Sequence, residues 1–497
     1  FFFLVFAPCL RACVQLTPCY FHTLLFCLQY LSVRPEITPE PYRRAFKVLQ
    51  TDAPCEPLAV VVGVIERELG RPIAELFAEI EERPCGSAST AQAHVARLHG
   101  AAGRQVVVKV QYPDAEELFN SDIVSLSQLA RLKHYFDDDD TNVGLEAALA
   151  EFKKQFSAEF DYEREVRDMQ DIGDSLRKHP KFSKSVCVPE PIEGLCTGRV
   201  ITMTYLPGPT LEAKASALLK SVGINLREGV KSVISKQEKG DGGAAQNNAK
   251  DDLFLAKPSA GGGVARRFVR LIGPDNALRL WRFADFVKRE IFERFSTWVT
   301  LDVIRVDAGG HWGTWAAKKR AEINEIAALS YVGEWCHTLI QVHGYEIFSS
   351  GIFNGDPHPG NILCLEDGRL GLIDYGQCKH LARASQKSLA RLICSVADDA
   401  ADAEVAGAFR QVGLVTKNDD TPFIAAFARL CLGPLRSEHL EYEWHMKLHA
   451  ADKVTVFPPD LIIFLRVAAL LRGLSLVLKQ NVSVAEQWRG HAKAALL

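Results

Sequence analysis

Residues 354–377 read NGDPHPGNILCLEDGRLGLIDYGQ and decide the expected fold of this chain. Asp356 is followed five positions later by Asn361, and a second acid, Asp374, lies in an Ile-Asp-Tyr-Gly turn. Two short apolar runs flank the dipeptide Asp367-Gly368, which is typical of a hairpin turn. The sequence therefore predicts a small hairpin with an acid at each end, so that the two carboxylates can converge on one point.

An acid, an amide and a second acid in this order are the groups that phosphoryl transfer uses. One acid accepts the proton of the attacking hydroxyl, while the amide and the second acid hold Mg²⁺ on the phosphates. The alternative is a surface hairpin whose Asp and Asn residues only form turns. We favour the first interpretation, because a turn requires neither an acid at both ends nor the D-x-x-x-x-N spacing.

Size and composition are those of a globular, multidomain protein. The chain has 497 residues, a net charge of -3 and a hydrophobic content of 47%, which predicts two or three domains. The slight negative charge argues against a nucleic-acid partner, since such binding depends on neutralising phosphates. Its 13 cysteines include no C-x-x-C pair, which favours reduced, mostly buried thiols over a disulfide framework.

Two apolar stretches are candidates for membrane segments. Residues 1–31 are rich in cysteine but are interrupted by prolines and an arginine, short of the roughly 18 apolar residues that a spanning helix needs. We expect either a membrane-touching segment or a buried or mistranslated leader. The stretch 461–478 contains two arginines, which favours a core helix.

The first half of the chain alternates helix and strand patterns. The expected elements are, in order, a helix within 58–77, a loop of small residues at 85–92, strands at 93–98 and 105–110, a long helix at 146–176 and a strand at 200–206. The low-complexity segment 237–263 predicts a disordered loop or an insertion. Helical patterns resume from residue 321 and enclose the hairpin. This is the order of parts in a two-lobed kinase fold.

Lys109 lies in the second strand-like run, where a lysine is costly to bury unless it is paired. The long helix offers Glu159, Asp161 and Glu165 as partners. In kinase-like sites the strand lysine reaches the phosphates and is oriented by a helix glutamate. The alternative is an edge-strand lysine that extends its charge to solvent. With the hairpin present, we predict that Lys109 binds phosphate.

The small-residue loop stands where a glycine-rich phosphate loop would be. It contains Gly86, Ser87, Ala88 and Ser89 but no G-x-G-x-x-G. Small side chains permit close approach of a nucleotide to the backbone. The alternative is a helix N-terminus capped by one of the serines, and both interpretations can hold together.

Together these segments resemble the UbiB family of atypical kinases, also called aarF-domain or ABC-one kinases. The resemblance covers about residues 29–230 and 330 to the C-terminus. It is carried by the loop PCGSAS at 84–89, VKVQYP at 108–113, EFDYERE at 159–165, DPHPGN at 356–361 and DYGQ at 374–377. It implies an α+β, two-lobed protein-kinase-like fold with a small β-containing N-lobe, a mostly helical C-lobe and an N-terminal helical extension.

The resemblance also implies roles for the motif residues. Lys109 would pair with Glu159 and contact phosphate, Asp356 would be the catalytic-loop acid, and Asn361 and Asp374 would hold Mg²⁺. ATP would be bound by Lys109 and by the loop of Gly86, Ser87, Ala88 and Ser89. Asp161 and Glu165 would belong to the family's own helix motif.

Two departures from the family pattern stand out. The family has a K-x-G-Q element before the kinase core, and here Phe26 and Leu28 stand where Lys and Gly are expected. Either the N-terminus is incorrectly predicted from the gene, or this autoinhibitory device is broken. Gly86 in an alanine-rich loop is the second departure, and it is expected to alter nucleotide preference.

The sequence after the second acid leaves little room for a substrate-docking loop. An apolar helical pattern begins within about a dozen residues of Gly376, and no A-P-E motif follows. Protein kinases place a peptide-docking loop in that interval. A protein substrate is therefore disfavoured, and ATP hydrolysis or phosphorylation of a small or lipid-linked partner fits better.

Three functions follow from these patterns. The first is a Mg²⁺-dependent atypical kinase or ATPase that supports isoprenoid-quinone or lipid metabolism in a mitochondrion or chloroplast, at a membrane surface. Its partners would be ATP and a lipid, a quinone precursor or the enzymes that make it. The second is a nucleotide-gated, pseudokinase-like adaptor, and the third is a small-molecule phosphotransferase.

The expected domain division has four parts. These are an N-terminal extension at 1–57, an N-lobe at 58–215, an insertion at 216–320 and a C-lobe at 321–497 that contains the hairpin 354–377.

Overall fold

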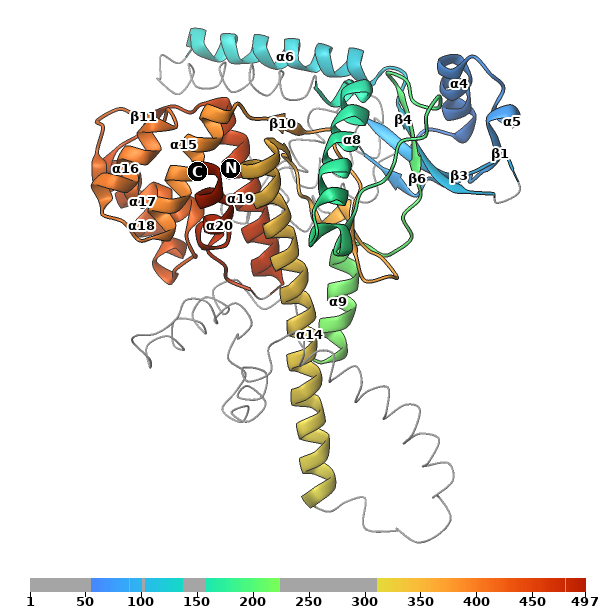
Figure 1. Ribbon diagram of the computed structural model, residues 1–497. Helices are drawn as coiled ribbons and strands as arrows, with labels where there is room; N and C mark the ends of the chain where they lie inside the picture. Colours follow the sequence, from blue (N-terminus) through green and yellow to red (C-terminus); the bar gives the residue numbers. More distant parts are fainter. Residues whose placement is uncertain (1–54, 89, 101–102, 137–157, 224–310, 479) are drawn as a thin grey trace. The chain divides into compact units, whose positions relative to one another are not determined.

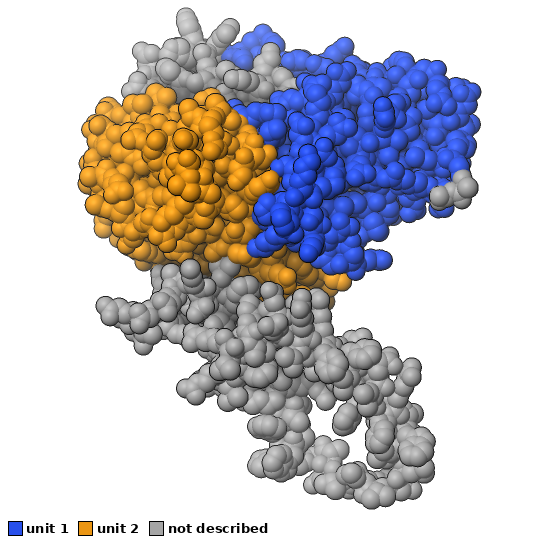
Figure 2. Space-filling view, viewed as in Figure 1, with its two compact units in different colours: residues 1–208, 352–356, 365–380 blue, residues 209–351, 357–364, 381–497 orange. Residues whose placement is uncertain are grey.

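The computed structural model describes residues 55–88, 90–100, 103–136, 158–223, 311–478 and 480–497 (Figure 1). The chain forms two compact units, coloured separately in Figure 2. Unit 1 comprises residues 1–208, 352–356 and 365–380, and unit 2 comprises residues 209–351, 357–364 and 381–497. The parts of the segment 354–377 that carry Asp356 and Asp374 therefore group with the N-terminal half of the chain.

Unit 1 is built on an antiparallel sheet with the strand order β1-β3-β4-β6, in which β2 pairs with β3. The strands are β1 (Phe77–Ile80), β2 (Gly86–Ser87), β3 (Ala91–Leu98), β4 (Gln105–Gln111) and β6 (Val200–Thr204). Alternate residues of a strand point to opposite faces. In β4 the valines 106, 108 and 110 are at most 1% exposed and share a core cluster with helix α4 (Leu58–Leu69).

Unit 1 contains further helices and strands besides this sheet and α4. They are α5 (Ile73–Leu76), α6 (Ala115–Phe136), η1 (Ala158–Phe160), α8 (Tyr162–Lys178), η2 (Phe182–Lys184), β5 (Val186–Cys187), β7 (Ile352–Asn354), β9 (Leu370–Leu372) and β10 (Cys378–His380). Strand β5 pairs in parallel with β9, and β7 pairs antiparallel with β10. The second pairing brings the residues before Asp356 alongside those that follow the second acid.

Unit 2 is mostly helical. Its helices are α9 (Leu211–Ser221), α14 (His311–Tyr345), η5 (Glu346–Ser350), η6 (Pro359–Asn361), α15 (Arg383–Ala397), α16 (Asp402–Gln411), α17 (Thr421–Leu432), η7 (Ser437–Leu440), α18 (Tyr442–Ala451), α19 (Pro459–Val477) and α20 (Val484–Leu496). Its strands are β8 (Ile362–Cys364), β11 (Val415–Thr416) and β12 (Val454–Val456). The fully buried Trp488 lies 6.1 Å from Phe348 and 5.5 Å from Phe464, measured between ring centroids.

Several expected helices and strands are confirmed, and others have different bounds from those expected. The strands at 93–98, 105–110 and 200–206 are present as β3, β4 and β6, with adjusted ends. The helix expected within 58–77 ends at Leu69, where Gly70 caps it and Pro72 follows. Of the expected helix 146–176, residues 162–176 lie in α8, which begins at Tyr162 because Asp161 caps its N-terminus. Residues 146–157 lie outside the described residues.

The stretch 461–478 forms α19, whose core-facing residues are buried, as expected of a core helix. Within the described ranges, no helix combines the length and apolar character needed to cross a membrane. The N-terminal stretch, the altered K-x-G-Q element and the low-complexity segment 237–263 lie outside the described residues. The four-part domain division stays a prediction.

Candidate active site

Lys109 projects from the face of β4 opposite its buried valines. Its neighbours across the sheet are Ala93 on β3 and Ile201 on β6. Its ammonium lies 5.2 Å from the ring centroid of Tyr162, the first residue of α8. Because side chains alternate between the two faces of a strand, the Lys109 side chain points away from the core that contains α4 and toward α8.

The partner of Lys109 is Glu165, not Glu159 as the family resemblance implied. Lys109 Nζ lies 2.7 Å from Glu165 Oε1, and the Glu165 side chain is only 2% exposed. The reason is the start of α8: the Asp161 carboxylate accepts a hydrogen bond of 2.9 Å from Arg164 N, which satisfies a free amide of the first turn. Because the helix begins there, Glu165 rather than Glu159 falls on its sheet-facing side.

Glu159 instead contacts the DYGQ segment at 374–377, which contains Asp374. Its carboxylate accepts a hydrogen bond from the Gln377 side chain. Burial first, and then the charges of Asp374 and Asp356, raise the pKa of Glu159 to about 8. Glu159 therefore carries a proton near neutral pH and is a poor partner for an ammonium.

Asp374 completes the charged cluster. Its Oδ1 atom lies 3.3 Å from Lys109 Nζ and accepts a hydrogen bond of 3.1 Å from Gly376 N. Burial acts to raise the pKa of Asp374, but the Lys109 charge and the Gly376 amide outweigh it, so the pKa lies below its usual value. Asp374 is thus an anion with a 41% exposed side chain, available to a further cation.

Burial and neighbouring charges have opposite effects on the pKa values of Lys109 and Glu165. Burial acts to lower the pKa of Lys109, but Asp374 and Glu165 raise it well above its usual value. Burial raises the pKa of Glu165 to about 7 despite the Lys109 charge, and Asp374 adds to the rise. One ammonium thus faces two carboxyl groups and stays charged.

Asn354 links the two acids of the hairpin, a role that sequence reasoning missed. Its side-chain amide donates to Asp374 O at 2.7 Å, and its Oδ1 accepts from Asp356 N at 2.8 Å. Gly355 N also donates to Gln377 O at 2.9 Å. These bonds fix Asp356 and Asp374 on adjacent backbone segments within unit 1. The signal in the sequence was the polar Asn354 directly after the apolar residues Ile352 and Phe353.

The small-residue loop forms a β-turn hairpin rather than a capped helix. Gly86 pairs with Ala93, and Ala88 N donates to Ala91 O at 2.8 Å, closing the turn between β2 and β3. The interpretation as a helix N-terminus is therefore wrong. Ser87 Oγ lies 3.0 Å from Tyr112 Oη. Ser89 lies outside the described residues.

Asn361 belongs to unit 2. It ends η6, where its backbone N–H donates to His358 O at 2.9 Å and His358 Nδ1 accepts from Gly360 N at 3.1 Å. Across the ranges that the structure describes, no three His, Cys, Asp or Glu side chains gather as a metal centre. Mg²⁺ in nucleotide sites commonly uses only one or two carboxylates besides the phosphates, so the predicted ligand pair is compatible with this finding.

The family comparison covers more than half of the chain. Residues 48–235 and 321–405 match the model of the ABC1 atypical kinase-like domain. The chain belongs to this ABC1 family. The family match includes the small-residue loop, Lys109, the 159–165 motif and the segment 354–377, but not the altered K-x-G-Q element. The mixed fold of small antiparallel sheets and helices agrees with a two-lobed kinase-like architecture.

Curated relatives carry kinase names. The chain is 23% identical over 399 residues to Protein ACTIVITY OF BC1 COMPLEX KINASE 1, chloroplastic, of Arabidopsis thaliana, covering 80% of this chain and 42% of that protein. It is 33% identical over 198 residues to AarF domain-containing protein kinase 1 of Xenopus tropicalis, covering 40% and 36%. With Probable protein kinase UbiB of Pseudomonas paraeruginosa it shares 32% over 180 residues, covering 36% and 33%.

The matched regions span less than half the length of these relatives. Among solved structures, the complex of Rv3197 with erythromycin from Mycobacterium tuberculosis has a TM-score of 0.47 and 19% identity, covering 92% of this chain and 89% of that one. The recognition of the family from its motifs, and the kinase-like fold class, are confirmed.

Proposed function

We propose that this ABC1-family chain is a Mg²⁺-dependent ATPase or atypical kinase that supports isoprenoid-quinone or lipid metabolism in a mitochondrion or chloroplast. The observation that carries the proposal is the arrangement of Lys109 between Glu165 and Asp374 at 2.7 and 3.3 Å. A strand lysine oriented by a helix glutamate, beside the acid of a D-[FY]-G turn, is the arrangement of nucleotide-binding kinase sites.

The charges of unit 1 fit a bound Mg²⁺–nucleotide. Glu159, Asp356 and Asp374 lie close enough that, after burial, the charges of the two aspartates raise the pKa of Glu159 to about 8. A cation near Asp374 would relieve this repulsion, and carboxylate and amide oxygens are the ligands that Mg²⁺ prefers. We assign Asp374 and Asn361 as its ligands. When bound, Mg²⁺ neutralises charge on the phosphate oxygens.

The remaining residues have separate tasks in this proposal. Lys109 binds phosphate oxygens, and Glu165 orients it. Asp356, whose backbone is fixed by Asn354 at 2.8 Å, accepts the proton of the attacking hydroxyl or water. Glu159 is a positioning residue that holds the DYGQ turn through Gln377. The hairpin of Gly86, Ser87 and Ala88, with Ser89, covers the nucleotide.

The short interval after the DYGQ turn supports a small or lipid-linked acceptor. Helix α15 begins at Arg383, seven residues after Gly376, with only the short strand β10 between them. A peptide-docking loop like that of protein kinases needs more chain than this. The name of the Arabidopsis relative, which is called chloroplastic, supports the proposal that this chain acts in an organelle.

The test is ATP hydrolysis by the purified chain with and without Mg²⁺, in solution and on vesicles of anionic or zwitterionic lipid. Asp374→Asn keeps an oxygen that can accept from Gly376 N but loses the charge that binds the cation, so hydrolysis should fall by about 100-fold or more. The exposed Asp171→Asn on α8 is the control and should hydrolyse ATP normally. Stimulation by anionic vesicles would support the lipid acceptor.

Two outcomes would replace the proposal. Nucleotide binding without hydrolysis under any condition would favour the adaptor function, in which Asp374 serves binding alone. Rapid phosphorylation of a soluble alcohol or amine, unaffected by vesicles, would favour the small-molecule phosphotransferase. The presence of every phosphate and metal ligand of the family motif argues against the adaptor.

A further inference from the structure

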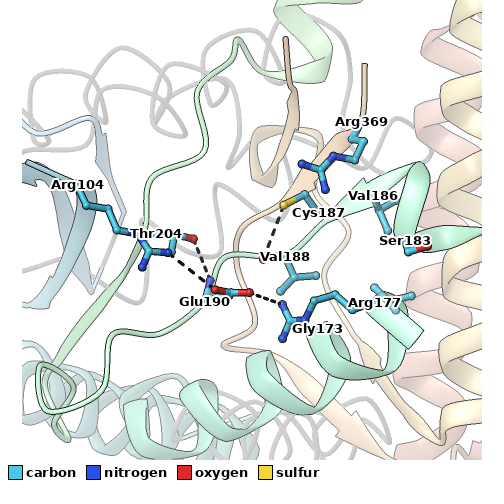
Figure 3. Close-up of a pocket in the computed structure, with 11 residues that line it drawn as sticks. Arg104, Gly173, Arg177, Ser183, Val186, Cys187, Val188, Glu190, Thr204 and Arg369 are labelled. Atoms are coloured by element: carbon cyan, nitrogen blue, oxygen red, sulfur yellow. Dashed lines mark hydrogen bonds and ion pairs between the residues drawn. The ribbon is translucent and has the colours of Figure 1, made fainter. Parts of the chain in front are cut away.

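A cavity of about 310 Å³ lies in unit 1, lined by residues that the catalytic proposal does not use. Figure 3 shows it between the C-terminal half of α8 and the segments around β5. Its lining is Arg104, Gly173, Leu176, Arg177, Ser183, Val186, Cys187, Val188, Glu190, Thr204 and Arg369. The volume is at the lower end of the range for small-molecule sites.

Three guanidinium groups and one carboxylate line this cavity. In Figure 3, Arg104 and Arg177 approach Glu190 from opposite sides, with Arg177 Nη1 at 3.3 Å and Arg104 Nη2 at 3.9 Å from its oxygens. The Glu190 charge is thus shared by two cations. The three arginine side chains remain 36–56% exposed, so their other N–H groups can reach a ligand.

Two further carboxylates that pair with these arginines lie outside the lining. Arg177 binds Asp174 at 2.7 Å, and Arg369 binds Asp367 at 2.7 Å. With these acids counted, the neighbourhood is neutral. Attraction for an anion therefore comes from guanidinium donors close to the cavity, not from net charge. Each guanidinium carries five N–H donors in a planar fork that matches phosphate oxygens.

The backbone of α8 makes room for one of these guanidinium groups. A Cβ atom added at Gly173 would lie 3.3 Å from both terminal nitrogens of Arg177 and 3.4 Å from Val188. The absence of a side chain at this position lets Arg177 lie against the helix and face the cavity. The remaining lining includes the apolar residues Leu176, Val186 and Val188, which are 2–6% exposed.

From these observations we propose that the cavity binds a phosphomonoester with a short apolar body. The phosphate would lie among Arg104, Arg177 and Arg369, and the apolar part would contact Leu176 and the two valines. Such a ligand is either a soluble metabolite or the head of an anionic lipid. The site is separate from the catalytic one, since Glu165 lies two turns earlier on α8, about 12 Å from Gly173 along the helix axis.

Cys187 offers a direct readout because its thiol lines the cavity and forms no disulfide. The experiment measures the alkylation rate of each cysteine by mass spectrometry, with n-butyl phosphate, inorganic phosphate or n-butanol added to the whole chain. We expect n-butyl phosphate to slow alkylation of Cys187 several-fold and inorganic phosphate to do so only at higher concentration. n-Butanol should have no effect. The exposed Cys85, also in unit 1, is the control.

Variants assign the protection to the cavity. Arg177→Gln and Arg369→Gln should each raise the half-protecting concentration about tenfold, as expected for loss of a charge-assisted contact. Gly173→Ala keeps every charge but displaces Arg177, and it should weaken protection without lowering the unfolding temperature. Lys109→Met should retain full protection, because phosphate at the catalytic site does not shield Cys187.

Vesicles distinguish the two sources of phosphate. Protection by phosphatidic acid vesicles, but not by phosphatidylcholine vesicles, would identify a lipid head, whereas protection by free n-butyl phosphate alone would identify a soluble ligand. Both outcomes support the site. Equal slowing at Cys85, protection that survives both arginine variants, or no protection by any phosphate would overturn it.

Discussion

The ammonium of Lys109 lies 2.7 Å from the carboxylate of Glu165, which joins strand β4 to the first turn of helix α8. Glu165 is 2% exposed, and Lys109 is 21% exposed. A buried charge is tolerated only when its partner is in place. The pair therefore serves the stability of unit 1 as well as the orientation of the lysine.

We predict that Lys109→Met destabilises the folded chain by about 1–3 kcal/mol at pH 8, since it leaves a buried carboxylate without its cation. The loss should shrink toward pH 5, because Glu165 can then take up a proton. Adding Glu165→Gln should recover most of the stability. Urea unfolding of the two variants at both pH values measures this. Equal losses in the single and double variants would contradict the prediction.

Glu159 gives the stability of the chain a distinct pH dependence. In the folded state its pKa is raised to about 8 from the usual value of 4.5. Between these values the folded state keeps a proton that the unfolded state has lost, so the stability falls as the pH rises through this window. The Glu159 carboxyl group therefore lowers the free energy of unfolding at alkaline pH and has no such effect below about pH 4.5.

Glu159→Gln should remove this cost while keeping a hydrogen bond to Gln377. Without Mg²⁺, the variant should match the wild type near pH 4.5 and exceed it by about 1–2 kcal/mol at pH 8.5. Thermal unfolding across this range measures the difference. Glu163→Gln, at a 69% exposed side chain, is the control and should show no such trend. A constant difference at all pH values would refute the assignment to Glu159.

Asp168 ties α8 to β10, the strand that follows the DYGQ turn. Its side chain is 3% exposed, and its oxygens lie 2.7 Å from His380 Nε2 and 3.4 Å from Arg164 Nε. Arg164 also donates to Cys378 O. The helix that carries Glu165 and the segment that follows Asp374 are thus held by one buried carboxylate.

We predict that Asp168→Ala lowers the free energy of unfolding by about 2–4 kcal/mol, because two donors lose a buried acceptor. Asp174→Ala, on the same helix but 59% exposed and paired with Arg177, should cost no more than about 1 kcal/mol. Chemical denaturation followed by circular dichroism compares the two. Similar losses in both variants would show that Asp168 does not connect α8 to β10.

Local patterns were sufficient to predict much of the fold. The apolar run Val106-Val107-Val108-Lys109-Val110 predicted a strand that carries Lys109, and β4 includes all five residues. The DPHPGN and DYGQ motifs predicted both the family and the segments that carry the acids. These features are determined by residues within a few positions of one another, so they can be recognised directly in the sequence.

The pairing within the site could not be predicted in the same way. Whether Lys109 meets Glu159 or Glu165 depends on where α8 begins, and the start is set by the Asp161 cap. The contact between Glu159 and Gln377 joins residues 218 positions apart. The sequence around Gly86 was compatible with both a turn and a helix N-cap, because serine is common in both. Only the pairing of β2 with β3 decides between these two structures.

Close packing in unit 2 gives a last prediction, at the contact of α14 with α20. A Cβ atom added at Gly344 would lie 2.7 Å from Trp488 Cδ1 and 2.9 Å from His491 Cδ2. Trp488 is fully buried and donates to Ile340 O at 2.7 Å, so the ring has little freedom to move. The glycine is therefore required by the close approach of the two helices.

Gly344→Ala should lower the free energy of unfolding by about 1–3 kcal/mol, the usual cost of overpacking a core. Gly407→Ala, in the middle of α16 with nothing within 4 Å of the added atom, should instead raise it by about 0.5–1 kcal/mol, since alanine favours the helix. Thermal unfolding of the two variants compares the same chemical change in a filled and an open site. A gain in stability for Gly344→Ala would mean that α14 and α20 approach less closely than the structure describes.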